Sequence, residues 1–160
     1  IILIVLSGIV CLACTGQDYE PVQPIAYSHK VHAGDNKIPC LYCHFGAEKS
    51  RHAGIPPASV CMNCHKKIKT DSPEIGKIKE AIEKNRPIEW VKVHRFPDFA
   101  YFNHSQHVAV GKVACQECHG PVETMTLLKQ VKEMTMGWCL DCHRKRPVTP
   151  GGLDCAKCHY

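Results

Sequence analysis

The sequence predicts a mostly irregular chain with short α-helices, whose interior is not made of side chains alone. Three observations support this fold class. Ten of the twelve cysteines stand in five Cys-x-x-Cys-His motifs, part of this pattern occurs twice along the chain, and glycine and proline are frequent, with 11 of each. Five motifs in 160 residues leave 32 residues for each. That is too little chain to build an ordinary side-chain core around every motif.

The five motifs share the pattern Cys-x-x-Cys-His. Motif 1 holds Cys40, Cys43 and His44; motif 2, Cys61, Cys64 and His65; motif 3, Cys115, Cys118 and His119; motif 4, Cys139, Cys142 and His143; motif 5, Cys155, Cys158 and His159. Cysteine at this density indicates a disulfide framework, zinc sites or covalent haem. Disulfides need no fixed histidine, and zinc needs four ligands, so two motifs would share one metal. Only haem attachment uses all three residues, because two thiols bond the vinyl groups and the histidine binds iron. The sequence therefore predicts five covalently bound haem c groups that form the core.

Six of the 11 histidines lie outside the motifs, and five irons with two imidazoles each would need five of them. They are His29, His32, His52, His94, His104 and His107. We predict His29, His32, His104 and His107 as second axial ligands, because each His-x-x-His pair falls in one helical turn and its rings point in different directions. His52 and His94 compete for the fifth place, and His52 is preferred because it lies between motifs 1 and 2.

A methionine could replace one of these second histidines and would raise the potential of that iron. Met125, Met134 and Met136 are better placed than Met62, which lies inside motif 2. For any single methionine, packing is the more common role.

An internal repeat sets the organisation of the chain. The pattern Aromatic-x-His-x-x-His-x7-Cys-x-x-Cys-His begins at Tyr27 and again at Phe102. In each copy, the first cysteine of a further motif follows the first cysteine of the copy by 21 or 24 residues. This predicts duplicated haem modules with a fifth haem at the carboxyl end. We expect an anchor over residues 1–18, a two-haem module over 19–71, a helical linker over 72–93 and a three-haem module over 94–160.

The linker carries the clearest helix signal. Residues 72–85 begin with Ser72 as a candidate N-cap and Pro73 in the first turn, and isoleucines at 75, 78 and 82 share one face. Residues 88–94 alternate weakly and predict a short strand. Glycine and proline predict loops over residues 54–57 and 147–152.

The amino-terminal run IILIVLSGIVCLA is apolar and uncharged over residues 1–13. It is shorter than the roughly 20 residues that span a bilayer, but without an initiator methionine we expect further sequence upstream. A lipoprotein-type signal cleaved before Cys14 and a retained anchor are the two alternatives. The retained transmembrane helix is favoured, since Cys11 stands where such a cleavage site prefers leucine.

The formal charge of +5 does not describe the cofactor-loaded protein. Five haems bring about ten negative propionate charges, so the lysines are better interpreted as partners for propionates than as a nucleic-acid surface. No triad, phosphate loop or paired carboxylate indicates other chemistry. We therefore expect no catalytic site in the chain itself and no nucleic-acid partner.

Three stretches resemble the pentahaem cytochrome c subunit of alternative complex III, a bacterial quinol oxidoreductase. They are residues 90–107 (WVKVHRFPDFAYFNHSQH), residues 53–57 (AGIPP) ahead of motif 2, and residues 136–144 (MGWCLDCHR). The resemblance extends over nearly the whole chain from about Tyr19, within the wider class III-type multihaem cytochromes. The multihaem subunit of menaquinone reductase complexes is similar too, but it carries one haem more than this chain has motifs.

The resemblance implies a subunit of a larger complex. Its partners would be an iron–sulfur, molybdopterin-like subunit, integral membrane quinol-binding subunits, and a cytochrome c, other carrier or oxidase as acceptor. The haem domain would stand on the periplasmic side of the inner membrane, held by the amino-terminal helix. Two alternatives stay open: a free-standing periplasmic multihaem shuttle, and a multihaem oxyanion reductase, which needs a five-coordinate iron.

Overall fold

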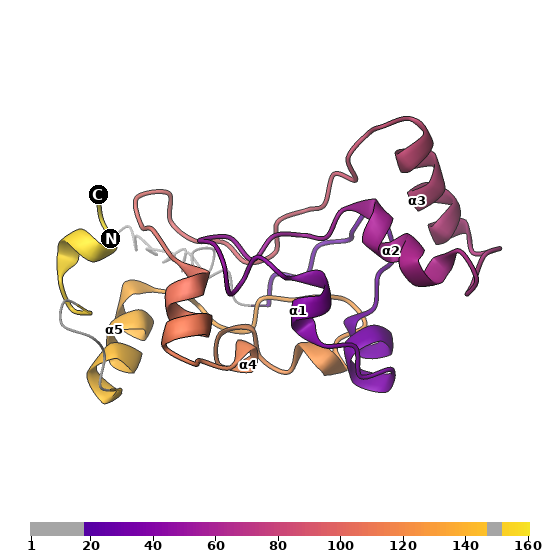
Figure 1. Cartoon of the computed structure of the whole chain (residues 1–160). Coiled ribbons are helices and arrows are strands. Elements are labelled where there is room, and N and C mark those ends of the chain that lie inside the picture. Colours follow the sequence, from indigo (N-terminus) through magenta and orange to yellow (C-terminus); the bar gives the residue numbers. More distant parts are fainter. Residues whose placement is uncertain (1–17, 147–151) are drawn as a thin grey trace, which may run out of the picture.

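The computed structural model describes residues 18–146 and 152–160 and consists of short helices joined by long irregular segments (Figure 1). In chain order the helices are η1 (Lys30–Asp35), α1 (Cys40–Cys43), α2 (Ala58–His65), α3 (Pro73–Glu83), η2 (Gln106–Val110), α4 (Cys115–His119), η3 (Val122–Thr124), α5 (Met136–Lys145) and η4 (Cys155–Lys157). Turns η1 and η2 are π-helical, and η3 and η4 are 3-10 helical. The described ranges contain no β-strand, so the predicted irregular, short-helix fold class is confirmed.

The predicted linker helix is confirmed as α3. Ser72 precedes its first residue as N-cap, Pro73 stands in the first turn, and Glu74 lies near the positive end of the helix dipole. Of the three isoleucines on the predicted face, Ile75 and Ile78 are buried, whereas Ile82 is 46% exposed. The helix therefore packs through its first two turns and leaves its end in solvent.

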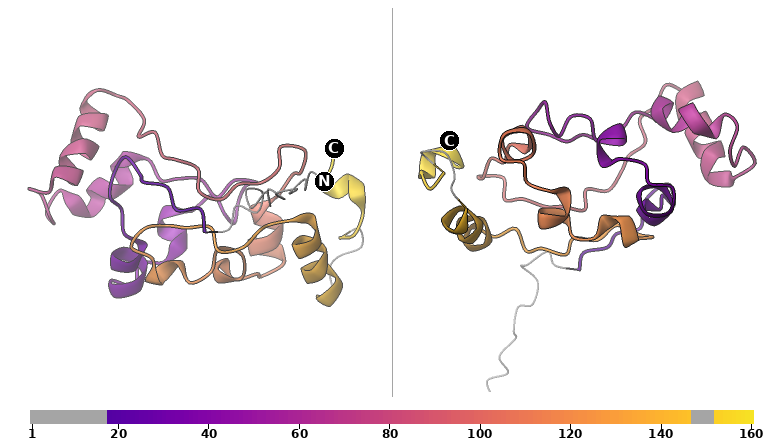
Figure 2. Two further views of the ribbon diagram at one scale, coloured as in Figure 1. Left: turned by 180° about the vertical axis from the view of Figure 1, so that it is seen from behind. Right: turned by 60° about the horizontal axis from the view of Figure 1, so that its bottom comes forward.

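A small side-chain core joins α3 to α2. Met62 of α2 packs with Ile75 and Ile78 of α3 and with Ile25 from the amino-terminal segment. The Glu74 carboxylate accepts a hydrogen bond of 2.7 Å from the backbone N–H of Ala26, which holds that segment against the helix. All views place α2 and α3 at one end of the molecule and η4 at the other (Figures 1 and 2). This apolar cluster therefore supports one end of the fold only.

The prediction of a strand over residues 88–94 was wrong. This segment is irregular, and Val91 bonds to a side chain instead of a neighbouring strand. Its N–H donates to Gln23 Oε1 at 2.9 Å, and its carbonyl accepts from Gln23 Nε2 at 3.0 Å. One glutamine amide thus satisfies the backbone groups that a strand ladder would have used.

The two copies of the repeat fold alike. Turns η1 and η2 end at corresponding residues, Asp35 and Val110, and each ends with a hydrogen bond from residue i+5 to residue i, at Asn36 and Gly111. Lys37 and Lys112 follow in corresponding positions, with positive φ angles of 55° and 51°. The sequence repeat is therefore a structural repeat, including the widened turn that carries each His-x-x-His pair.

Backbone hydrogen bonds also join the two modules that contain these copies. The N–H of Lys30 in η1 donates to the carbonyl of Met125, between motifs 3 and 4. The N–H groups of His104 and Ser105 donate to the carbonyls of Arg51 and Ser50, between motifs 1 and 2. The two modules are thus interlocked through their backbones.

Gly34 lies where η1 meets η3, and a Cβ at this position would overlap the backbone carbonyl oxygen of Glu123. We expect Gly34→Ala to lower the free energy of unfolding of the haem-loaded chain by about 2 kcal/mol, because backbone must move to admit the methyl group. Gly76 in α3 has open space around it, so Gly76→Ala should instead stabilise by about 1 kcal/mol. Guanidinium unfolding followed by circular dichroism checks both. Equal effects of the two changes would contradict the close packing of η1 on η3.

The predicted anchor over residues 1–18 lies outside the described residues except for its last position. Cys11 and Cys14, and the predicted loop over 147–152 apart from Gly152, also lie outside them. Across residues 18–146 and 152–160, no helix has the length and apolar character needed to cross a membrane.

Candidate haem-binding site

Each of the five motifs begins in a short helix. Motifs 1 to 5 lie respectively in α1, α2, α4, α5 and η4. Because residues three apart on a helix share a side, the two thiols of a motif face the same way. All ten motif cysteines are free, so the disulfide alternative is not realised there. Among the described residues, no group of three or more His, Cys, Asp or Glu side chains is placed to hold a metal ion, as the zinc alternative requires.

The motif histidines are oriented by backbone carbonyls. Four of the five have Nδ1 within hydrogen-bond distance of a carbonyl oxygen: His44 with Gly54, His65 with Ile68, His143 with Gly152 and His159 with Phe99. A carbonyl can only accept, so Nδ1 carries the proton and Nε2 keeps its lone pair. This is the tautomer of an imidazole that binds a metal through Nε2.

Three of the four histidines of the two repeated turns have the same arrangement, whereas Nδ1 of His29 is buried and has no hydrogen-bond partner. His32, His104 and His107 each have Nδ1 at 2.8 Å from a carbonyl oxygen, of Ser28, Arg51 and Asn103 respectively. In the first copy, the ring of Tyr27 lies 4.8 Å from His29 and 4.4 Å from His32. In the second, Phe102 lies 4.8 Å from His104 and 4.3 Å from His107. The aromatic residue of the repeat therefore packs between both imidazoles and fixes their directions.

Four histidines of the turns face four motif histidines. The ring centroids are 6.5 Å apart for His29 and His44, 6.0 Å for His32 and His65, 6.4 Å for His104 and His119, and 6.0 Å for His107 and His143. An imidazole nitrogen bonds a transition metal at about 2 Å, and the ring centroid lies about 1 Å behind it, so two rings on opposite sides of one metal are about 6 Å apart. The four pairs fit that spacing, and each could hold one haem iron.

Burial favours the neutral form of three of these imidazoles, those of His29, His107 and His119. It lowers the pKa of His29 to about 4 and of His119 to about 3, and neighbouring imidazoles lower both further. Burial also lowers the pKa of His107, against the opposing effect of its bond to the Asn103 carbonyl. Since only the neutral ring can bind a metal, the sites are prepared for ligation.

Residues 100–160, which hold motifs 3 to 5 and the second His-x-x-His pair, match the family described as cytochrome c7 and related cytochrome c. This segment of the chain is cytochrome c7-like. It is also similar to the menaquinone reductase, multiheme cytochrome c subunit, of Nitratidesulfovibrio vulgaris (strain Hildenborough), with 33% identity over 98 residues. The match covers 61% of this chain and 45% of that relative, so the chain spans less than half of the relative's length.

The five motifs form a row in space whose order differs from their order in the sequence. At each junction of the row, a thiol of one motif raises the pKa of a thiol of the next, with burial as the larger cause. These pairs are Cys61 acting on Cys43, Cys40 on Cys115, Cys142 on Cys118 and Cys158 on Cys139. The order is therefore motif 2, 1, 3, 4, 5, from the α2–α3 end to η4 (Figure 2).

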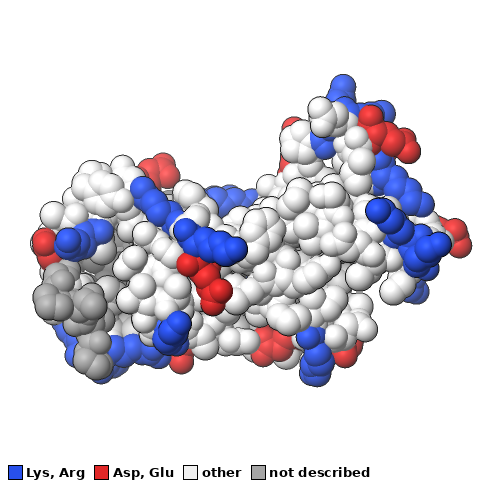
Figure 3. All heavy atoms as spheres, viewed as in Figure 1, with Lys and Arg blue, Asp and Glu red and all other residues white. Residues whose placement is uncertain are grey.

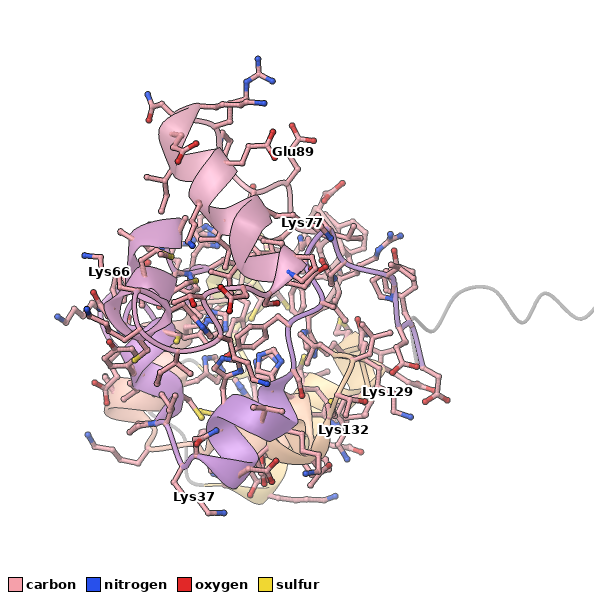
Figure 4. The ribbon with its side chains drawn as sticks, turned by 90° about the vertical axis from the view of Figure 1, so that its right-hand side faces the viewer. Lys37, Lys66, Lys77, Glu89, Lys129 and Lys132 are labelled. Carbon is pink, nitrogen blue, oxygen red and sulfur yellow. The ribbon has the colours of Figure 1, made fainter. Side chains whose placement is uncertain are left out.

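Charged side chains lie around the outside of this row. Figure 3 shows a broad uncharged region over the middle of one face, with Lys and Arg prominent toward the α2–α3 end. Seen along the row, the labelled Lys37 and Lys66 extend away from the interior (Figure 4). Burial in the interior lowers the pKa values of His29, His107 and His119, as expected for imidazoles shielded from water.

The four facing ring pairs do not include the histidine of motif 5, His159. His52 is exposed, and no described imidazole lies opposite it or opposite His159 at the spacing of the other four pairs. His94 is half-buried, with its Nε2 atom buried and its ring 4.3 Å from His119. Met125 is buried, whereas Met136 is 67% exposed. The sequence pattern carries no signal for the backbone carbonyls that orient the imidazoles or for the order of the motifs in space.

Proposed function

We propose that the chain is the multihaem electron-transfer subunit of a membrane-bound, quinol-oxidising complex and that it binds five c-type haems through the ten motif cysteines. The observation that carries this proposal is the row of five attachment motifs with four imidazole pairs at the spacing of axial ligands. Bound haem supplies a one-electron redox centre at each motif. The chain supplies the thiols, the neutral imidazoles and the close succession of sites.

The proposed axial pairs are those that face each other. His44 pairs with His29, His65 with His32, His119 with His104, and His143 with His107. His159 is the proposed motif ligand of the fifth haem, and His52 stays the sequence-based prediction for its second ligand. Saturated irons favour electron conduction over substrate chemistry, since an open position is what a haem needs to bind a substrate.

Similarity to two known cytochrome subunits supports the proposal that this chain is part of a quinol-linked membrane complex. The relative in Nitratidesulfovibrio vulgaris is by name a subunit of a menaquinone reductase, and residues 90–107 resemble the pentahaem subunit of alternative complex III. We propose that this chain belongs to a complex of the second kind. It would dock on an iron–sulfur, molybdopterin-like subunit and on integral quinol-binding subunits. Its haem domain would face the periplasm, with residues 1–18 as the anchor.

The test is purification of the chain from its native membrane through a carboxy-terminal tag in mild detergent. We expect large hydrophobic subunits to co-purify, the chain to carry five haems by mass spectrometry, and menaquinol to reduce those haems. The last result follows because a quinol-oxidising complex delivers electrons to its cytochrome.

Two results would contradict the proposal in different ways. A haem-loaded chain that is soluble and monomeric without detergent would make it a free shuttle. Haems that pass electrons to added menaquinone, but take none from menaquinol under the same conditions, would make the complex a quinone reductase.

A further inference from the structure

His119 differs from the other motif histidines in its surroundings. The remaining four have Nδ1 against a backbone carbonyl. No hydrogen bond joins the ring of His119 to any residue in the described ranges, although the ring is largely buried and faces His104 like the other paired ligands. A metal-binding imidazole usually donates its second N–H to an acceptor, which fixes its plane and raises its basicity. His119 needs such an acceptor from somewhere other than the backbone.

The ring of His94 contacts this ring more closely than the ring of His104 does. The two imidazoles are edge-to-face, with centroids 4.3 Å apart and planes at 88°. The Nε2 atom of His94 is buried and has no hydrogen-bond partner. A buried nitrogen without a partner is destabilising, so an apolar ring would pack here more favourably. The unpartnered Nε2 therefore indicates a polar role.

The backbone around His94 is fixed. Val93 is buried, and the N–H of Arg95 donates to the Oε1 atom of Gln130 at 2.9 Å. Gln130 is 1% exposed, and its Nε2 donates to the carbonyl of Lys132. Contacts of the residues on both sides thus hold His94 in place beside His119, and its broad χ2 torsion allows the ring to rotate.

The spacing excludes His94 as the partner of His119 on one iron. Two imidazoles across an iron have centroids about 6 Å apart, as His104 and His119 do at 6.4 Å. At 4.3 Å, the rings of His94 and His119 are in direct contact. Since ring nitrogens lie about 1 Å from their centroids, a small rotation brings Nε2 of His94 to hydrogen-bond distance of Nδ1 of His119.

We propose that His94 is a positioning residue for the haem of motif 3: its Nε2 accepts a hydrogen bond from Nδ1–H of His119, in place of the carbonyl that serves the other motif histidines. The inference rests on the proposed haem ligation by His119 and His104. An acceptor at Nδ1 makes the imidazole a stronger donor to iron and favours the oxidised state. His94 therefore lowers the potential of this haem, which stands at the centre of the row.

The test uses His94→Phe in the full chain within its complex, because phenylalanine keeps a buried ring but has no nitrogen. We expect five low-spin haems as in the unchanged protein, and a rise in one midpoint potential in a spectroelectrochemical titration. The electron paramagnetic resonance signal of the same haem should shift, since that signal follows the orientation of the imidazole planes. His94→Gln, which restores an acceptor, should bring both values back toward those of the unchanged protein. Val93→Ala is the control for disturbed packing and should move neither.

Three results would overturn the inference. Unchanged potentials and signals in His94→Phe would reduce His94 to a packing residue. One new high-spin haem that binds carbon monoxide would make it an iron ligand. The same shift in Val93→Ala would make the effect a general one of packing. Fewer than five haems, or a high-spin haem, in the unchanged protein would instead contradict the proposed function.

Discussion

Chain produced without haem attachment should not fold. The described residues bury only seven apolar side chains, and four of these form the cluster between α2 and α3 and the amino-terminal segment. Elsewhere the interior is lined by imidazoles, which cannot form a stable core by themselves. We expect the haem-free chain to show the circular dichroism of a largely unfolded polypeptide and no cooperative thermal transition, because ordering of the backbone is not offset by burial.

Removing one motif at a time tests how much the fold depends on each haem. Replacing Cys115 and Cys118 by alanine removes the haem at the centre of the row, where neighbouring sites on both sides depend on it. Replacing Cys155 and Cys158 removes the haem at the end, beside η4. We expect the first double variant to lose most folded protein and the second to keep four haems and the helical signal. A haem-free chain with a sharp unfolding transition would contradict the haem-based core.

The sequence predicts those features that depend on local chemistry. Ser72 and Pro73 mark the start of α3 because an N-cap and a proline in the first turn act within a few residues. The repeated His-x-x-His turns are also foreseeable, and both copies fold alike down to the positive φ of Lys37 and Lys112. The strand over 88–94 fails because Gln23, 68 residues away from Val91, takes its backbone groups.

The arrangement of the site depends on long-range contacts that a pattern does not carry. The sequence gives the histidines but not which of them face each other. His94 and His52 look equivalent as spare histidines, yet His94 is half-buried against His119 and His52 is exposed. The order 2, 1, 3, 4, 5 arises because each module binds the backbone of the other, at Lys30 with Met125 and His104 with Arg51.

Loss of one histidine from a facing pair should leave one iron with a single protein ligand and should leave the other irons unchanged. For His107→Ala, we expect one fifth of the haem to become high-spin and to bind carbon monoxide after reduction, because His143 alone then remains at that iron. Absorbance and carbon monoxide titration measure the fraction. Gln106→Ala is the matched control, since Gln106 lies exposed in the same turn η2 and carries no imidazole. It should bind no carbon monoxide.

The double variant decides whether the two histidines of one turn serve two irons. His104 faces His119 and His107 faces His143, so His104→Ala with His107→Ala should double the carbon monoxide bound, to two fifths of the haem. A value of one fifth would place both histidines at a single iron and contradict the pairing. Replacement by methionine provides a second, independent measure, because a thioether ligand raises the potential of the iron that it binds. His104→Met and His107→Met should therefore raise two different midpoint potentials, and together both.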